Sequence, residues 1–225
     1  MTGGLLRWEE LKAPATSALV RTYLPGTGGG RALDLGCGSA AVAAALAGDF
    51  DTVVGLDPDP SAVRRARARE VAAVRAEAER LPFRDAAFDC VYSYGALHHA
   101  RPHRALPEIA RVLAPGGVAV LADFCATPGT PAGRGLSRIA PILATAVAAL
   151  PGYARRAGVS TALRVTAYRL SPAWVRHVRR DVFLPPAQFR AVYRASLQGA
   201  RFHQQNGLIV VVWRKTSDPA SGGTA

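Results

Sequence analysis

The sequence is poor in cysteine and has no long apolar run. Three cysteines, Cys37, Cys90 and Cys125, occur among 225 residues, widely spaced and without a CxxC pair. This usage predicts reduced thiols in a cytoplasmic protein and argues against a disulfide framework or a zinc site. No run of 18 apolar residues is present, so we expect no transmembrane helix. Residues 1–10 lack a charged segment followed by an apolar one, so we expect no secretory leader.

Lysine is almost absent as well. Lys12 and Lys215 are the only two lysines among 28 basic residues, and the formal net charge is +12. Such a charge permits RNA or an anionic membrane as a partner, but abundant arginine and alanine are also typical of a GC-rich genome. The sequence shows no interleaving of aromatic and basic residues of the kind that binds single strands. We therefore expect no nucleic-acid partner, keep peripheral membrane contact open, and leave the oligomeric state undecided.

Strand and helix signals alternate through the first half of the chain. The expected strands are 31–35, 52–56, 71–75, 88–93 and 118–124, and the expected helices are 5–24, 40–47, 61–70 and 103–113. This alternation predicts an α/β fold in which right-handed crossovers build a buried parallel sheet. We expect Pro115-Gly116-Gly117 to form a turn that ends the last of these helices before the fifth strand.

The pattern changes after residue 124. Helices are expected at 136–150, 161–170, 172–180 and 186–197, and two strands, 201–205 and 208–214, flank Asn206-Gly207. Asn-Gly between two strands is the strongest short signal for a hairpin. We divide the chain into an N-terminal helical segment (1–30), a core (31–124), a helical insertion or lid (125–184), a last helix and hairpin that complete the sheet (185–215), and a disordered tail (216–225).

The segment 32–40 carries the clearest chemical signal. A short apolar strand leads into Gly36-Cys37-Gly38, and a helix-forming run follows at once. Glycines let a ligand approach the backbone closely, and the start of a helix offers unpaired N–H groups to a negative group. The spacing Gly36-x-Gly38-x-x-Ala41, with Asp57 farther on, also fits a dinucleotide-binding turn. The turn alone predicts a nucleotide-type ligand and leaves its identity open.

Three further features help to identify this ligand. Asp34 stands two residues before the first glycine, the run 77–83 (EAERLPF) precedes the fourth strand, and the run 111–117 (RVLAPGG) precedes the fifth. Together they resemble the class I S-adenosylmethionine-dependent methyltransferases, in particular the ubiquinone- and menaquinone-type enzymes of the methyltransferase domain 11 group. The resemblance covers residues 31–124 and the terminal hairpin. It implies a Rossmann-like sheet of seven strands, parallel except for the last, and S-adenosylmethionine as the cofactor.

The resemblance also assigns cofactor contacts by position. Asp34, Gly36, Cys37 and Gly38 would line the turn under the methionine part of the cofactor. Asp57, at the end of the second strand, would accept hydrogen bonds from both ribose hydroxyls. A carboxylate suits this task because it accepts two hydrogen bonds at once.

The two ends of the cofactor would meet residues from neighbouring loops. Pro58 would pack near the adenine, Glu77 would accept from the adenine amino group, and the Ala78 N–H would bond a ring nitrogen. Tyr94, after the fourth strand, aligns with the residue whose backbone meets the methionine ammonium. The chain departs from the family pattern at Ala40, where glycine is usual, and at Glu77, where aspartate is more usual. We expect the Ala40 methyl group to narrow the turn without closing it, and the loop to absorb the longer glutamate.

Methyl transfer needs a base only where the acceptor must lose a proton. His98, after the fourth strand at the carboxyl edge of the sheet, is the candidate base because histidine titrates near neutral pH. The alternative is that His98 has a structural role. Tyr94 is a second catalytic candidate, and Asp123, which ends the fifth strand, is expected to face the acceptor. His99 and His103 have a spacing that suits a metal on a helix, but their loop context argues against it, so we expect no metal site.

The insertion carries no motif that names an acceptor. Its apolar helix at 136–150, bracketed by Arg134, Arg138, Arg155 and Arg156, is compatible with a pocket wall, a lid or a membrane contact. We predict a methyltransferase that acts at oxygen, carbon or nitrogen of a small, apolar or aromatic acceptor. Two alternatives stay open, an RNA or protein methyltransferase that uses the basic surface and a non-catalytic or NAD-type nucleotide-binding domain.

Overall fold

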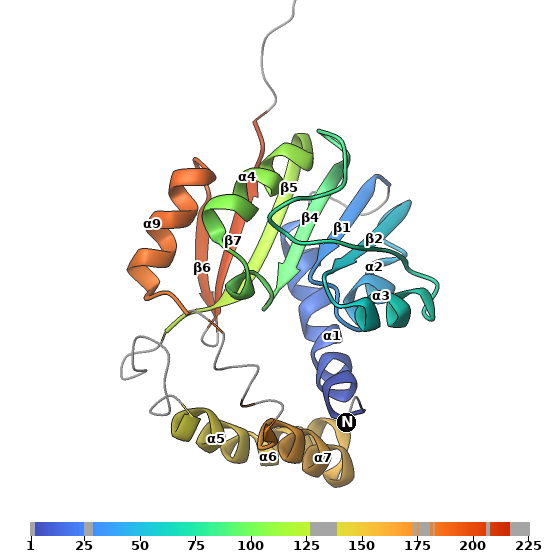
Figure 1. Cartoon of the computed structure of the whole chain (residues 1–225), viewed down its shortest axis with the longest axis vertical. Helices are drawn as coiled ribbons and strands as arrows, with labels where there is room; N and C mark the ends of the chain where they lie inside the picture. The colour runs from blue at the N-terminus through green and yellow to red at the C-terminus, as the bar shows by residue number, and fades with distance from the viewer. Residues whose placement is uncertain are drawn as a thin grey trace, which may run out of the picture.

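A single seven-stranded sheet forms the centre of the molecule. The computed structural model describes residues 3–24, 29–126, 139–172, 175, 181, 183–205 and 208–216. The strand order is β3-β2-β1-β4-β5-β7-β6 (Figure 1). The strands are β1 (Arg31–Leu35), β2 (Thr52–Asp57), β3 (Ala72–Arg75), β4 (Phe88–Tyr94), β5 (Leu113–Phe124), β6 (Arg201–Gln205) and β7 (Leu208–Arg214). Neighbours are parallel except that β7 runs antiparallel to both β5 and β6, which confirms the predicted fold and hairpin.

Helices cover both faces of this sheet. They are α1 (Gly3–Tyr23), α2 (Ala41–Leu46), α3 (Pro60–Arg67), the 3-10 turn η1 (Leu97–His99), α4 (Pro102–Val112), α5 (Ile139–Ala148), α6 (Leu150–Ala157), α7 (Val159–Arg169) and α9 (Pro186–Ser196). Successive side chains of a strand point to opposite faces. Leu33 of β1 therefore packs in one core with α4 and α9, and Ala32 packs in the other with α1, α2 and α3. Burial on both faces is what a parallel sheet requires.

Three helices stand apart from the sheet. α5, α6 and α7 form a layer beyond the carboxyl ends of the parallel strands, and α7 contacts α1 (Figure 1). The helix expected at 136–150 is divided, because α5 ends at Ala148 and α6 begins at Leu150. Pro151 explains the division, since proline fits the first turn of a new helix better than a helix interior. None of the described helices combines the length and apolar character needed to cross a bilayer.

The start of the fifth strand differs from the expectation. Pro115-Gly116-Gly117 is not a separate turn before the strand, because β5 begins at Leu113 directly after α4 and includes these residues. Between two consecutive pairings, four residues of β5 (114–117) stand opposite one residue of β4, so the extra residues bulge out of the ladder. Gly116 adopts a φ of 77°, and its N–H donates to the Lys215 carbonyl oxygen. The glycines thus allow the irregular start of β5, which is hydrogen-bonded to Lys215 after β7.

Several expectations fall on other parts of the chain. The linker at 25–28, the start of the insertion at 127–138, most of the helix expected at 172–180, the Asn206-Gly207 turn and the tail from 217 lie outside the described residues. The proposed division into segments therefore stays a prediction.

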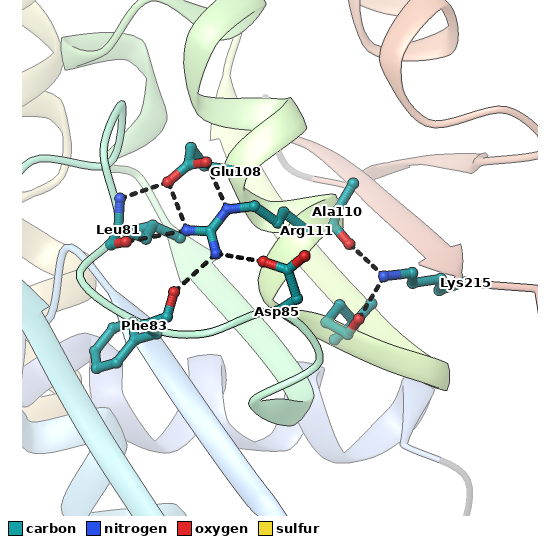
Figure 2. Close-up of polar contacts among 8 residues, drawn as sticks. Leu81, Phe83, Asp85, Glu108, Ala110, Arg111 and Lys215 are labelled. Atoms are coloured by element: carbon teal, nitrogen blue, oxygen red, sulfur yellow. Dashed lines mark hydrogen bonds and ion pairs between the residues drawn. The ribbon is translucent and has the colours of Figure 1, made fainter.

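One arginine joins two of the motifs that were noted separately in the sequence. The Arg111 guanidinium, near the end of α4, bonds the Glu108 and Asp85 carboxylates and the carbonyl oxygens of Leu81 and Phe83 (Figure 2). The Glu108 carboxylate also accepts from the Leu81 N–H at 2.7 Å. These contacts raise the pKa of Arg111 through the carboxylates that bond it. The run 77–83 is therefore fixed to α4 by a planar, multiply bonded cation.

Replacing Arg111 should destabilise the fold. Arg111→Met keeps most of the side-chain volume but removes the donor to two carbonyl oxygens, and it leaves the Glu108 carboxylate with the Leu81 N–H alone. Because the side chain is partly exposed, we expect a loss of about 1–3 kcal/mol in the free energy of unfolding, measured by urea titration. Arg104→Met, at an exposed position of the same helix, should cost less than about 0.5 kcal/mol. Equal losses in the two variants would contradict the anchoring role of Arg111.

Candidate functional site

The ends of β1 and β2 are joined by a short set of hydrogen bonds. The N–H groups of Gly36 and Cys37 both donate to the Leu56 carbonyl oxygen, at 2.8 and 3.0 Å. The Gly38 N–H donates to Asp57 Oδ2 at 3.0 Å. The glycine turn after β1 and the carboxylate that ends β2 are therefore parts of one rigid unit at the carboxyl edge of the sheet.

The backbone of this turn is left-handed at three positions. Gly36 has a φ of 80°, Gly38 of 53° and Ala40 of 56°. A Cβ built on Gly36 would lie 2.3 Å from Cβ of Ala96, which follows β4, so the bare backbone lets the two loops touch. Ala40 adopts the conformation that favours glycine and is fully buried, which gives a physical reason for the glycine usual there. Such backbone strain costs on the order of 1–3 kcal/mol.

The Asp57 carboxylate already accepts hydrogen bonds from two backbone N–H groups of the protein. Its Oδ1 accepts from the Asp59 N–H at 2.9 Å, and its Oδ2 accepts from Gly38. Burial raises the pKa of Asp57, and the two backbone hydrogen bonds oppose that shift. Each carboxylate oxygen can accept more than one hydrogen bond, so both can still receive donors from a ligand. Pro58, exposed beside it, accepts from Arg75 Nε at 3.1 Å.

Asp34 and Cys37 lie below the surface of the edge. Asp34 is buried in β1, where its partner in the β1–β4 register is Tyr92. Burial and the Asp34 carboxylate raise the pKa of Tyr92. Cys37 is buried against Gly55 of β2, where an added Cβ would lie 2.9 Å from the Cys37 sulfur. These two residues shape the floor of the turn.

Glu77, Ala78 and Tyr94 occupy neighbouring loop positions. Glu77 is exposed just after β3, its carbonyl oxygen accepts from the Arg80 N–H, and Ala78 packs against the core. Tyr94 ends β4, and burial raises the pKa of its hydroxyl. The ammonium of Lys12, from α1, lies 5.5 Å from the centroid of the Tyr94 ring. No sequence pattern predicts this contribution of α1, because it depends on packing between distant segments.

His98 is held by a buried carboxylate. Its Nδ1 lies 2.6 Å from Oδ1 of Asp123, near the end of β5, and both side chains are buried. The same oxygen accepts from the Phe124 N–H at 2.8 Å. In the neutral tautomer whose Nδ1–H donates to this carboxylate, Nε2 keeps a lone pair. The structure thus brings together the two residues that the sequence placed at the ends of β4 and β5.

A second carboxylate approaches the same histidines. Asp181, which the sequence analysis missed, is buried with Oδ1 3.1 Å from His99 Nδ1 and Oδ2 3.8 Å from His98 Nε2. Among the described residues, these three side chains form the group whose ligand atoms lie within 4.8 Å of one another, as a metal would require. A cation there would occupy the Nε2 lone pair and remove His98 as a base. No motif marks Asp181, since it lies more than eighty positions along the chain from His98.

An apolar cavity opens beside the His98–Asp123 pair. It has a volume of about 170 Å³. The residues around it are Leu97, His98, Ala100, Arg101, Pro102, Asp123, Phe124, Leu184, Phe189 and Tyr193. Most of these side chains are aliphatic or aromatic, so the space suits a small apolar group next to one polar pair.

Comparisons with known proteins find methyltransferases. Residues 33–121 match the methyltransferase domain family. The chain is 36% identical over 143 residues to 27-O-demethylrifamycin SV methyltransferase of Amycolatopsis mediterranei, covering 56% of this chain and 52% of that protein. It is 34% identical over 143 residues to O-methyltransferase resE of Aspergillus sclerotiorum, covering 58% of this chain and 54% of that protein. The chain thus spans about half the length of these relatives.

A solved structure shows the same fold. An S-adenosylmethionine-dependent methyltransferase from Mesorhizobium loti superposes with a TM-score of 0.59 at 20% identity, covering 91% of this chain and 98% of that one. At this identity the likeness concerns the fold and not the substrate.

The contact between the turn and the loop after β4 can be tested at Gly36. Gly36→Ala adds a left-handed strain and a clash with Ala96, whereas Gly199→Ala adds the same strain, at a φ of 79°, with open space around its Cβ. We expect Gly199→Ala to lose about 1 kcal/mol of unfolding free energy and Gly36→Ala at least about 2 kcal/mol more. Thermal and urea unfolding measure both. Similar losses would mean that the close approach of the two loops is not a constraint.

Proposed function

The chain carries a class I methyltransferase domain at residues 33–121, and on that premise we propose that it transfers a methyl group from S-adenosylmethionine to a hydroxyl of a small apolar or aromatic acceptor. The observation that carries the choice of acceptor is the buried His98–Asp123 pair at the edge of an apolar cavity. A hydroxyl must lose its proton to become a good nucleophile, and this pair is built to take one.

The residues of the turn fit this cofactor. Gly36 and Gly38 leave the backbone bare where a ligand must approach, and Asp57 ends β2 with a carboxylate that can receive two hydroxyl donors. We assign Asp34, Cys37 and the two glycines to the methionine side. Pro58, Glu77 and Ala78 are assigned to the adenine, and the Tyr94 backbone to the ammonium group. The antiparallel β7 between β5 and β6 belongs to the methyltransferase fold, which favours this cofactor over NAD.

The protein contributes position and proton transfer. The cofactor supplies an activated methyl group, which needs no further activation by the protein. His98 accepts the proton of the acceptor hydroxyl at Nε2, and Asp123 fixes the ring orientation and stabilises the imidazolium that forms. Asp181, 3.8 Å from the same nitrogen, adds a second negative charge beside that imidazolium. The apolar side chains around the cavity exclude water from the acceptor oxygen.

The names of two relatives support methylation at oxygen. Both 27-O-demethylrifamycin SV methyltransferase and O-methyltransferase resE are named as acting at oxygen. The alternative of an RNA acceptor predicts affinity that falls steeply with salt. A small acceptor that binds in the apolar cavity predicts an affinity that depends little on salt.

The base can be tested by its removal. His98→Gln should lower kcat by about 10²–10⁴-fold with a hydroxylated acceptor, while S-adenosylmethionine affinity stays within about threefold because the ring is assigned to the acceptor. Release of S-adenosylhomocysteine with a panel of small phenols measures the rate. The matched control, His103→Gln, changes an exposed histidine of α4 and should keep the rate. Full activity in His98→Gln would contradict the role of His98 as the base.

A further inference from the structure

Positive charge is concentrated in one part of the chain. No Asp or Glu occurs between Asp123 and Asp181. The same stretch contains nine arginines, which are Arg134, Arg138, Arg155, Arg156, Arg164, Arg169, Arg176, Arg179 and Arg180. These nine account for most of the formal net charge of +12. A codon bias toward arginine does not explain why this stretch of 57 residues contains no acidic residue.

The described part of this stretch exposes aliphatic side chains. On α7, Ala162 and Val165 are buried against Tyr153 of α6. The side of the helix next to this buried face exposes Val159 and Leu163, 65% and 54% accessible. Leu170, just past the helix end, is 42% accessible. Positions 159, 163 and 170 form a stripe along one face of a helix, interrupted by the buried Thr166.

Arginines flank this stripe. Arg155 and Arg156 are exposed at the end of α6, which packs on α7, and Arg164 is exposed next to Leu163. We define the α6–α7 surface as Arg155, Arg156, Val159, Leu163, Arg164 and Leu170. Figure 1 shows that α6 and α7 belong to the layer that stands apart from the sheet. Aliphatic side chains bordered by arginines are typical of a helix that lies in the plane of a membrane interface.

We propose that the α6–α7 surface docks the protein onto an anionic lipid bilayer. Arginine guanidinium groups attract acidic headgroups, and Val159, Leu163 and Leu170 enter the boundary between headgroups and acyl chains. The stretch has no carboxylate that would repel the headgroups. An acidic protein is the competing occupant, but a protein interface is enriched in aromatic residues and methionine as well as arginine, and of these the α6–α7 surface has only arginine. The inference stands independently of the acceptor proposed above.

Vesicle sedimentation with the full chain tests the proposal. The probes are vesicles of phosphatidylcholine mixed with phosphatidylglycerol and vesicles of phosphatidylcholine alone. We expect binding to the mixed vesicles to be at least about tenfold tighter. Val159→Gln with Leu163→Gln should weaken it about tenfold, and the triple variant Arg155→Gln, Arg156→Gln, Arg164→Gln should weaken it by tenfold or more. All five positions are exposed, so melting temperatures should stay within a few degrees of the unmodified chain.

A matched triple variant separates the surface from the net charge. Arg64→Gln, Arg84→Gln and Arg104→Gln remove the same charge from exposed positions outside the helical layer and should change vesicle affinity less than about threefold. Equal loss in the two triple variants, equal binding to both kinds of vesicle, or no binding to the mixed vesicles would each overturn the proposal. Protection of α7 amides from hydrogen exchange on mixed vesicles would support it independently of affinity.

Discussion

The hydrogen bonds that join the ends of β1 and β2 are the constraint on which the candidate site depends. Leu56 accepts from two successive N–H groups of the turn, and Asp57 accepts from a third. With these bonds the turn is fixed over the sheet, and the loop after β4 can pack against Gly36. The carboxyl ends of β1, β2, β4 and β5 thereby form one edge, which is where ligands bind in open parallel sheets.

At this edge, one pair of strands is assigned to cofactor binding and another pair to proton removal. β1 and β2 present backbone and a carboxylate, which suit binding of a nucleoside. β4 and β5 present His98 and Asp123, which suit removal of a proton. Arg111 ties the run 77–83 to α4, and α4 follows η1, which holds His98. The run assigned above to the adenine side and the helix that follows the proposed base are therefore parts of one packed unit, so a substitution in one should also perturb the other.

The sequence predicted the sheet and the turn because both leave local signals. Buried strands appear as short apolar runs, and a tight turn under a ligand appears as glycines with an acidic residue before them. The pairing of His98 with Asp123 could be predicted, since His98 follows β4, Asp123 lies near the end of β5, and these two strands pair in the sheet. The positions of Asp181 and Lys12 at the site could not be predicted, because tertiary packing brings each from a distant segment and no local sequence pattern indicates it. The irregular start of β5 was missed since Pro-Gly-Gly is typical of a turn, whereas here hydrogen bonds with Lys215, which follows β7, complete the strand end.

Calorimetric titration of the unliganded protein tests the nature of this edge most directly. The proposed site predicts that S-adenosylmethionine binds and NAD does not. It further predicts that Asp57→Ala weakens S-adenosylmethionine at least about tenfold, since a carboxylate bonded to two hydroxyls is lost. Asp59→Ala, which removes the neighbouring helix-capping carboxylate, should change the affinity less than about threefold. Binding of NAD in place of S-adenosylmethionine, or unchanged affinity in Asp57→Ala, would contradict the assignment of this edge.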